Sequence, residues 1–380
     1  MKETGITTIT LKKINREKVY QYIYRQKETS KHQIVQDLQM GLSTVSQNLT
    51  ILERDGLITR NGYFESTGGR KAQIIRIAED FRISIGLGIL KDMFHIAAVN
   101  LYGDAIAAET IPLPYENSDA YYSRLAEIVE HFIQKHHYIP ERVAGISIAT
   151  QGIITPDGTG VLYGDLMGNT AMQLSDFSAR LPYPCHLEHD SKAAAELELW
   201  NHPQLDSALV LLLNPNLGGA VITGHRVHPG SHMRSGLFEH ICIDPDGPKC
   251  YCGKRGCLET YCSASALQSA AGMTVPDFFV VLRKKEADSK LLQIWQTYLD
   301  HLAFAIRNLT LVLDSPIIIS GSLAPYFQSE DIEYLLQQIN LQTLFPMTKQ
   351  QILLGTHGQY TPAIGAALYY VKQFLTCDTL

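Results

Sequence analysis

The sequence lacks any apolar run close to the ~20 residues that a membrane-spanning helix needs, and we expect no membrane partner. Its first residues, 1–13, are polar and do not resemble the apolar core of a signal peptide. These absences predict a cytoplasmic protein. With 380 residues, 45% of them hydrophobic, the chain can bury a substantial core and is long enough for two or three compact domains.

A surplus of positive charge is also missing from the chain as a whole, whose formal net charge is −6. The charges are unevenly distributed, however. Residues 1–71 hold 12 Lys and Arg against 7 Asp and Glu, whereas residues 72–380 hold 20 against 31. A basic head on an acidic body is typical of a nucleic-acid-binding module fused to a sensing or catalytic domain, although a chance scatter of surface charge gives the same count.

Cysteine is sparse outside one short segment. Of the 7 cysteines, Cys250, Cys252 and Cys257 lie close together, while the others are scattered. In a chain without a secretion signal, such a cluster favours a metal site over disulfide bonds.

The basic segment has the pattern of three short helices. Apolar residues at helical spacing predict helices over residues 15–25, 30–38 and 42–54, the second capped by Thr29 or Ser30. The tight connection at residues 39–41 makes the second and third helices a helix-turn-helix.

A β-hairpin is expected to follow the third helix. Residues 57–60 have the pattern of a strand, Asn61 and Gly62 that of a hairpin turn, and residues 63–65 that of the returning strand. This hairpin would be the wing of a winged helix-turn-helix, and the glycine pair before Arg70 and Lys71 would be a hinge to the next domain.

The third helix and the wing offer side chains suited to DNA. Short polar side chains can reach base edges, and arginines can reach phosphates. The alternative to DNA binding is a three-helix bundle that only mediates contacts with other proteins. The candidate DNA-binding residues are Thr44, Ser46, Gln47, Asn48, Arg54, Arg60 and Arg70.

Strands and helices alternate through the rest of the chain, residues 72–380, which indicates the α/β class. Three successive strands at residues 83–90, 94–100 and 105–111 predict an antiparallel start to a mixed sheet. We expect two α/β lobes with a cleft between them, because a second set of strands is predicted at residues 208–213, 219–223, 317–320 and 351–354.

The segment Cys250-Tyr251-Cys252-Gly253-Lys254-Arg255-Gly256-Cys257-Leu258-Glu259 resembles the C-x-C-G-x-x-G-C-x-E motif of the ROK family, which groups repressors with sugar kinases. The resemblance covers essentially the whole chain and is closest to the transcriptional-repressor branch, with its xylose and N-acetylglucosamine repressors. It implies an actin-like, ribonuclease-H-like ATPase fold in residues 72–380 behind a DNA-binding domain in residues 1–71.

The resemblance also implies a zinc site completed by His240. Three thiolates and one imidazole form a closed tetrahedral set that zinc favours, which implies a structural ion, and Gly253 and Gly256 let the loop fold back. The alternative is a reduced cysteine cluster beside an unrelated histidine. By resemblance, the ion braces a loop whose His240 and Glu259 face a bound sugar.

A second match lies at residues 188–195, where Asp190 takes the place of the general base of the family's kinases. His189 and Lys192 replace two asparagines of that motif. We therefore expect His189 and Asp190, with His240 and Glu259, to bind an effector. Without the resemblance, Asp190 before an alanine-rich helix can also be explained as a plain N-cap.

The two phosphate-binding loops of the family's kinases are degraded in this sequence. Gly88–Lys91 lacks the family's aspartate and first glycine, and Asn214–Ala220 contains a proline, which removes an amide donor. Leu237 also replaces a sugar-binding glutamate, which points to an unusual or modified sugar. The sequence therefore predicts no enzyme, with Asp190 as a vestigial base.

Taken together, these patterns predict a homodimeric or homotetrameric repressor of carbohydrate genes that binds an operator in double-stranded DNA and a sugar-derived effector. Two alternatives remain open from the sequence. One is an ATP-dependent sugar kinase with a DNA-binding head, and the other is a DNA-bound scaffold that takes no ligand.

Overall fold

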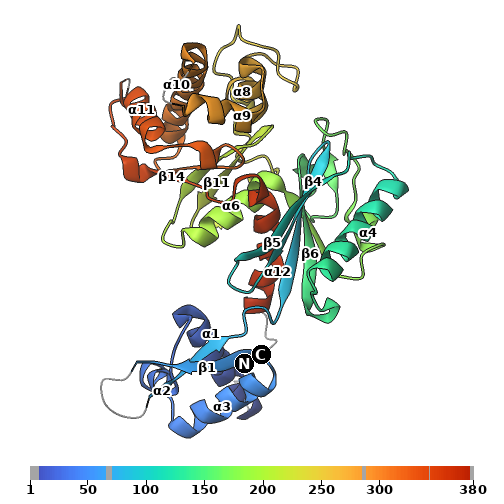
Figure 1. The fold of residues 1–380 in the computed structure, drawn as a ribbon, viewed down its shortest axis with the longest axis vertical. Coiled ribbons are helices and arrows are strands. Elements are labelled where there is room, and N and C mark those ends of the chain that lie inside the picture. Colours follow the sequence, from blue (N-terminus) through green and yellow to red (C-terminus); the bar gives the residue numbers. More distant parts are fainter. Residues whose placement is uncertain (1–7, 66–70, 285–287, 342, 377–380) are drawn as a thin grey trace, which may run out of the picture. The chain divides into compact units, whose positions relative to one another are not determined.

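The computed structural model describes residues 8–65, 71–284, 288–341 and 343–376, with the side chains described from residue 11 (Figure 1). The fold is mixed α/β, as predicted. It consists of two compact units. The head unit comprises the described residues up to Ile83, the turn Asn100–Asp104 and the chain from Val371 onward, and the body unit comprises Ser84–Val99 and Ala105–Tyr370.

The first residues of the head unit form the predicted helices: α1 Thr8–Gln26, α2 Lys31–Leu38 and α3 Leu42–Arg54. The hydroxyl of Ser30 caps α2 by accepting from the N–H of Gln33 at 3.3 Å, and Gln39 ends that helix in the left-handed region at φ 52°. α1 starts well before the predicted residue 15, so the helix carries an additional basic stretch.

The hairpin of the head unit differs from the predicted one. Strand β1 is Ile58–Tyr63 and pairs antiparallel with β2, Gln73–Ile77, with a register shift between Arg60 and Tyr63. The predicted turn at Asn61 and Gly62 is therefore an irregularity inside β1, and the predicted returning strand at residues 63–65 is wrong. The physical reason is burial, because β2 places Ile75 and Ile77 in the core and Tyr63 is exposed.

The core of the head unit explains why the unit extends past residue 71, where the sequence suggested a boundary. Tyr24 of α1 stacks on Tyr102 of the turn Asn100–Asp104, with ring centroids 5.2 Å apart. The amide of Gln21 donates to the carbonyl of Leu375 at 2.7 Å. The buried residues of this core are Val19, Tyr20, Ile23, Ile34, Val45, Leu49, Leu52, Leu57, Ile58, Ile75, Ile77 and Leu101.

The body unit contains two five-stranded sheets with the same strand order. In the first sheet the order is β5-β4-β3-β6-β9, and in the second it is β12-β11-β10-β13-β14. In each, the first three strands in the chain form an antiparallel meander and the last two are parallel. The predicted antiparallel start of a mixed sheet is confirmed.

The first sheet consists of β3 Ile83–Ile89, β4 Met93–Val99, β5 Ala105–Pro112, β6 Val143–Thr150 and β9 Cys185–His189. Helix α4, Asp119–Lys135, precedes β6, and the segment between β6 and β9 holds β7 Ile153–Ile154, β8 Val161–Tyr163 and α5 Leu174–Ser178. Every residue of β3 is buried, since helices and strands cover both faces.

The second sheet consists of β10 Ala208–Leu213, β11 Leu217–Thr223, β12 Arg226–Val227, β13 Ile317–Ser320 and β14 Ile352–Leu354. The helices that occur between β12 and β14 in the chain are α7 Glu259–Cys262, α8 Ala264–Ala271, α9 Val275–Leu282, α10 Ser289–Val312 and α11 Ser329–Asn340. They form one continuous apolar core with β10 and β13, centred on residues such as Leu302, Ile306 and Leu335.

Two helices, α6 Asp190–Asn201 and α12 Thr361–Thr376, lie next to the sheets of the body unit (Figure 1). They cross closely, because a Cβ on Gly365 would stand 1.8 Å from the carbonyl oxygen of Ala193. This crossing fixes where α6 begins, and α6 begins at the functional site. Among the described residues no single helix is long and apolar enough to cross a membrane; only the bent pair α8 and α9, at 63°, passes that test together.

Candidate functional site

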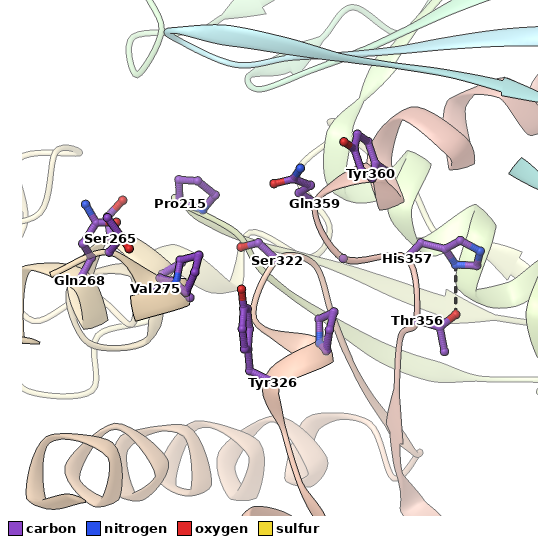
Figure 2. A pocket seen from close by; sticks show the side chains of 15 residues that line it. Pro215, Ser265, Gln268, Val275, Ser322, Tyr326, Thr356, His357, Gln359 and Tyr360 are labelled. Carbon is purple, nitrogen blue, oxygen red and sulfur yellow. Dashed lines mark hydrogen bonds between the residues drawn. The ribbon is translucent and has the colours of Figure 1, made fainter. Parts of the chain in front are cut away.

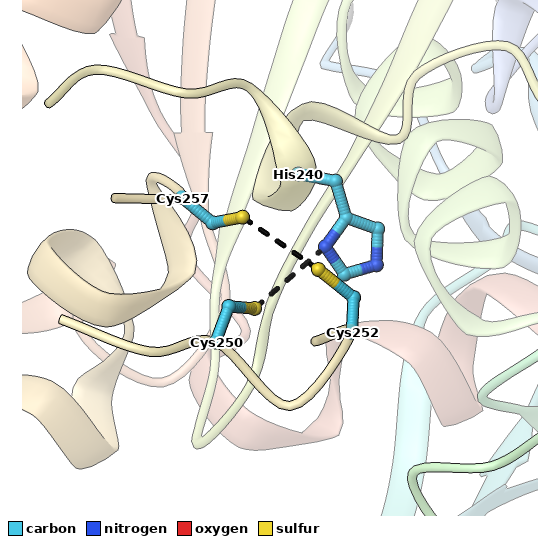
Figure 3. A group of neighbouring side chains, drawn as sticks. All are labelled: His240, Cys250, Cys252 and Cys257. Atoms are coloured by element: carbon cyan, nitrogen blue, oxygen red, sulfur yellow. Dashed lines mark hydrogen bonds between the residues drawn. The ribbon is translucent and has the colours of Figure 1, made fainter. Parts of the chain in front are cut away.

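The cysteine loop brings four potential metal ligands together. His240 ends a short 3-10 helix, Phe238–His240, while Cys250, Cys252 and Cys257 come from the loop that leads to α7 (Figure 3). Sγ of Cys250 lies 3.9 Å from Nδ1 of His240, and Sγ of Cys252 lies 3.7 Å from Sγ of Cys257. All four ligand atoms lie within 4.8 Å of one another.

These distances fit a tetrahedral ion. Metal–sulfur bonds of ~2.3 Å at tetrahedral angles place neighbouring ligand atoms about 3.8 Å apart. Cys250 and Cys257 are buried and the other two ligands are half-buried, so the donors are largely shielded from water. The cluster can therefore hold a metal ion, as predicted from the same four residues.

Two glycines shape the loop in the way the sequence suggested. Gly253 has φ +86° and Gly256 has φ +64°, in the region that side chains avoid. A Cβ on Gly256 would lie only 1.5 Å from the carbonyl oxygen of Asp244, whereas one on Gly253 would meet nothing within 4 Å. Gly256 therefore allows the close crossing of the loop strands that delivers Cys257 to the cluster.

A pocket of about 110 Å³ lies beside the cysteine loop, inside the body unit. Its wall comes from the segments after β6 and β8, the start of α6, the β10–β11 turn and the segment that contains His240. The lining residues are Gln151, Gly152, Ile153, Tyr163, Gly164, Asp165, Leu166, His189, Asp190, Ser191, Asn216, Leu217, Gly218, Leu237, Glu239, His240 and Tyr251.

Asp190 and His189 stand together at the pocket wall. Oδ1 of Asp190 accepts from the backbone N–H of Ser191 at 2.6 Å, and Nδ1 of His189 accepts from the same N–H at 3.1 Å. Burial lowers the pKa of His189, so its ring is neutral and carries its proton on Nε2. The 3.2 Å approach of Nδ1 to Asp190 is consequently no ion pair. His189 is the N-cap of α6, so capping does not by itself explain Asp190.

Glu239 is a pocket residue that the sequence-based candidates did not include. Its side chain is 7% exposed and its Oε2 has no hydrogen-bond partner. Burial raises the pKa of Glu239 to about 8, with smaller contributions from the nearby Asp190 and Glu259. The signal in the sequence was an acid directly before His240 and two residues after Leu237, which also lines the pocket.

One residue of the expected sugar site, Glu259, lies elsewhere, and so does Lys192 of the neighbouring motif. Both carboxylate oxygens of Glu259 are engaged, by the Asn216 amide at 2.9 Å and the Leu217 N–H at 2.7 Å, and Glu259 does not line the pocket. Its pKa is raised by burial. Lys192 contacts the carbonyls of Pro229 and Met233, so the ammonium group is also absent from the lining.

A separate concave surface of about 680 Å³ lies in the head unit, between α1 and α3. We call this surface the head groove. From α3 it is lined by four of the candidates predicted from the sequence, Thr44, Ser46, Gln47 and Asn48, together with Thr50 and Ile51. From α1 come four residues that were not among those candidates: Lys12, Lys13, Asn15 and Arg16. Lys12 and Lys13 were missed because the helix was predicted to start at residue 15, whereas Arg16 lies inside the predicted helix but was assigned no contact with DNA.

The candidate residues of the head unit differ in how accessible they are. Gln47 is exposed, whereas Asn48 is 6% exposed and its amide donates to the carbonyl of Thr44 at 2.9 Å. Ser46 is half-buried and its hydroxyl donates to the carbonyl of Leu42 at 2.7 Å.

Both described candidate arginines form ion pairs in the head unit. Arg54 pairs with Asp55 at 2.9 Å, and Arg60 pairs with Glu53 at 3.0 Å, which ties β1 to the end of α3. Both pairs are at least partly exposed, so they are weak and can exchange for other anions. Arg70 lies outside the described residues.

A second cavity of the body unit, of about 510 Å³, lies at the ends of the second sheet (Figure 2). None of the described residues that line it carries a formal charge apart from His357, if protonated. Pro215, from the degraded loop Asn214–Ala220, is part of this lining. Most of that predicted loop is in fact strand, since β11 begins at Leu217.

The other predicted phosphate loop, Gly88–Lys91, also has little free backbone. β3 continues to Ile89, and the N–H of Leu90 donates to the carbonyl of Met93 at 2.9 Å in a tight β-turn. A backbone amide that is already bonded is not available to a phosphate oxygen.

Known proteins resemble this chain in sequence and in fold. A model of the ROK family matches residues 83–373. The xylose repressor of Caldicellulosiruptor bescii is 24% identical over 351 residues, which is 87% of this chain and 88% of that protein.

Solved structures show the fold at lower identity. A ROK-family transcriptional regulator, described as a homologue of the Escherichia coli MLC protein, has a TM-score of 0.71 at 20% identity and covers 96% of this chain and 98% of its own. A ROK-family glucokinase from Streptomyces griseus, solved with glucose and AMPPNP, has a TM-score of 0.62 at 19% identity and covers 76% of this chain and 98% of its own.

Proposed function

Since this chain belongs to the ROK family, we propose that it is a transcriptional regulator, acting as a repressor of carbohydrate genes, whose DNA binding responds to a sugar-derived ligand. The observation that carries this proposal is the head unit. The regulator structure covers 96% of the chain, whereas 76% of the chain is enough to account for 98% of the glucokinase. The family model matches residues 83–373, so the helices and the hairpin that hold the head groove lie outside the matched region.

The head unit supports DNA binding as a winged helix-turn-helix. α3 would enter the major groove, with the exposed Gln47 and the half-buried Thr44 toward base edges. Lys12, Lys13 and Arg16 of α1 bring positive charge to the same concave surface, where they would meet phosphates. The β1–β2 hairpin would serve as the wing, with Arg60 at its base.

The pocket of the body unit supports a sensor role. Asp190, His189 and His240 line it, and a neutral imidazole beside a carboxylate offers both donors and acceptors to sugar hydroxyls. A ligand bound there acts on DNA binding only through its different affinities for the DNA-competent and DNA-incompetent conformations. A homodimer or homotetramer would present two heads to a palindromic operator in the cytoplasm.

The four-ligand cluster supports a structural zinc ion. Three thiolates and one imidazole suit zinc better than the oxygen-preferring cations, and all four positions are filled by protein. A bound ion of this kind would fix the cysteine loop and, through His240, one side of the pocket.

A regulator without kinase activity agrees with the second cavity and the two altered loops. The second cavity offers no lysine or arginine among its described lining residues, and Pro215 lacks an N–H. The retained Asp190 is the one feature that favours a kinase with a DNA-binding head. A coupled ADP-release assay over a sugar panel tests that alternative, which requires turnover that disappears in Asp190→Asn.

The function itself is tested by selecting genomic fragments with the purified full-length chain and measuring their affinity by gel shift. We expect one or a few palindromic fragments to bind at least about a thousandfold more tightly than random DNA. A sugar that raises the melting temperature of the protein should also change that affinity. Uniform binding to all fragments at moderate salt would refute the regulator, and thermal shifts without any effect on the gel shift would refute the sensor.

A further inference from the structure

We propose that the ligand of the body-unit pocket is a sugar with a free amine, and that Glu239 recognises its ammonium group. This inference rests on the proposed sensor function, which it narrows from sugars in general to amino sugars without an N-acyl group. It concerns a residue for which the sequence alone predicts no contact with a ligand.

The first observation is the unused carboxylate oxygen of Glu239. The side chain is more than nine-tenths buried, it lines the pocket, and its Oε2 has no hydrogen-bond partner. Buried carboxylate oxygens are nearly always paired, because an unpaired one loses its hydration without compensation. A partner for Glu239 is therefore expected to come from whatever occupies the pocket.

The second observation is the sign of the charge around the pocket. Asp165 and Asp190 line it together with Glu239, whose buried carboxyl becomes a further negative charge once a cation pairs with it, and no lysine or arginine occurs among the lining residues that the structure describes. Two lysines lie near the pocket without lining it: Lys192 is turned to the carbonyls of Pro229 and Met233, and Lys254 adds to the effect of burial in lowering the pKa of His240. Since the His189 ring is held as a neutral acceptor toward Ser191, it supplies no positive charge either.

These two observations select among sugar derivatives. A phosphorylated or acidic sugar would bring more negative charge into a pocket that has nothing to pair with it. A hydroxyl would satisfy Oε2 but leave the acids without a counter-charge. An ammonium group does both, since it has three donors and one positive charge, and charge-assisted hydrogen bonds are about twice as strong as neutral ones.

Leu237 adds an apolar surface to the pocket. It lines the pocket two residues before Glu239. A ligand recognised here needs its cationic group toward Glu239 and a nonpolar face, such as the C–H face of a sugar ring, toward Leu237.

The test compares matched sugars with the full-length, zinc-loaded protein by calorimetry. The probes are glucose, glucosamine, N-acetylglucosamine and glucosamine 6-phosphate, with the corresponding galactose and mannose series. We expect the amine member of at least one series to bind about tenfold or more tightly than its parent, N-acetyl and phosphorylated counterparts. A parent, N-acetyl or phosphorylated sugar that binds as tightly as the amine would overturn the proposal while leaving the sensor function intact.

Variants then assign the preference to Glu239. Glu239→Gln keeps the shape and removes the charge, so it should weaken the amine by about tenfold or more and leave the neutral parent within about threefold. Glu330→Gln is the matched control, because it removes one exposed acid of α11 that does not line the pocket. Zinc content and melting temperature identify a variant that has lost its fold, in which case the wild-type series alone decides.

The outcomes separate the two levels of the proposal. An amine preference that survives in a folded, zinc-loaded Glu239→Gln protein would show that another group recognises the amine. Binding of no sugar at all, together with selective operator binding, would overturn both the amine proposal and the sensor function but not the regulator.

Discussion

Sγ of Cys250 lies 3.9 Å from Nδ1 of His240, although ten positions of the sequence separate the two residues. The loop that joins them is held by backbone hydrogen bonds, among them the Ile243 N–H to the Gly256 carbonyl at 2.8 Å. An ion bound between these atoms would stabilise the native loop alone, since no such ligand set exists in the unfolded chain.

Removal of one metal ligand should therefore lower stability. We expect Cys252→Ser to release zinc and to cost about 2 kcal/mol or more, which lowers the melting temperature by roughly 4–8 °C. Atomic absorption and calorimetry measure both effects. Cys242→Ser is the control, because Cys242 is exposed and outside the cluster. Equal zinc content in the two variants would contradict a four-ligand site.

The two glycines of the cysteine loop should respond differently to alanine. Gly253→Ala introduces only the strain of a positive φ, at a cost of about 1–2 kcal/mol. Gly256→Ala has the same strain and would in addition force the loop away from the Asp244 carbonyl, so it should also lose metal. Denaturation with zinc analysis compares the pair. A Gly256→Ala protein with full zinc content and the milder cost would contradict the close crossing of the loop strands at Gly256.

The head groove predicts which basic residue of α1 contacts DNA. Lys12→Ala should weaken operator and random DNA alike and reduce the slope of log affinity against log salt by about 1. Lys18→Ala is the control, since Lys18 is exposed on the same helix but does not line the groove. If both variants show the same salt slope as the wild type, α1 does not contact phosphates.

The Gln47 side chain, in contrast, should contribute to recognition of the DNA base sequence. Gln47→Ala is expected to cost about 1–3 kcal/mol on the preferred operator and little on random DNA, because an amide pairs with base edges rather than with the backbone. Competition gel shifts with single-base operator variants locate the affected position. A loss of equal size on random DNA would place Gln47 at the backbone.

A buried acid of α6 should make stability depend on pH. Glu198 is 1% exposed, its Oε1 accepts from the Ser320 hydroxyl at 2.5 Å, and burial raises its pKa. As pH rises above about 4.3, Glu198 ionises in the unfolded chain while it stays protonated in the native protein. This difference lowers the free energy of unfolding progressively until pH passes the higher native pKa of Glu198. Glu198→Gln removes that loss.

We therefore expect Glu198→Gln to become more stable relative to the wild type as pH rises above about 4.3 in urea titrations. Glu330→Gln, at an exposed position of α11, is the control and should leave the pH profile unchanged. A stability difference that shrinks toward high pH would contradict a raised native pKa of Glu198.

Sequence periodicity predicted the regular elements of the fold well. α3 begins at Leu42 and ends at Arg54 as expected, and β10 and β13 match their predicted ranges, because each buries a continuous apolar pattern of its own. The pairing of β1 with β2 was not predictable from a local turn signal, since it depends on Ile75 and Ile77 reaching the head core.

The sites divide in the same way. The potential metal ligands Cys250, Cys252 and Cys257 are close in sequence and chemically distinctive, so the sequence predicted the cluster that they form with His240. Glu239 and Lys12 are ordinary charged residues whose position becomes meaningful only when the fold places them in a pocket or a groove. Glu259 is the opposite case, since its motif suggested a ligand contact. Both of its carboxylate oxygens instead accept hydrogen bonds from other groups of the chain, which the motif does not reveal.

His240 is shared by two sites, since it lines the pocket and also takes part in the cysteine cluster. Its imidazole cannot turn toward one occupant without changing its distance to the other. If the proposed ion and the proposed ligand both contact His240, their binding is thermodynamically linked, and each alters the apparent affinity of the other by the same factor. The availability of metal in the cell would thereby become a second input to gene control.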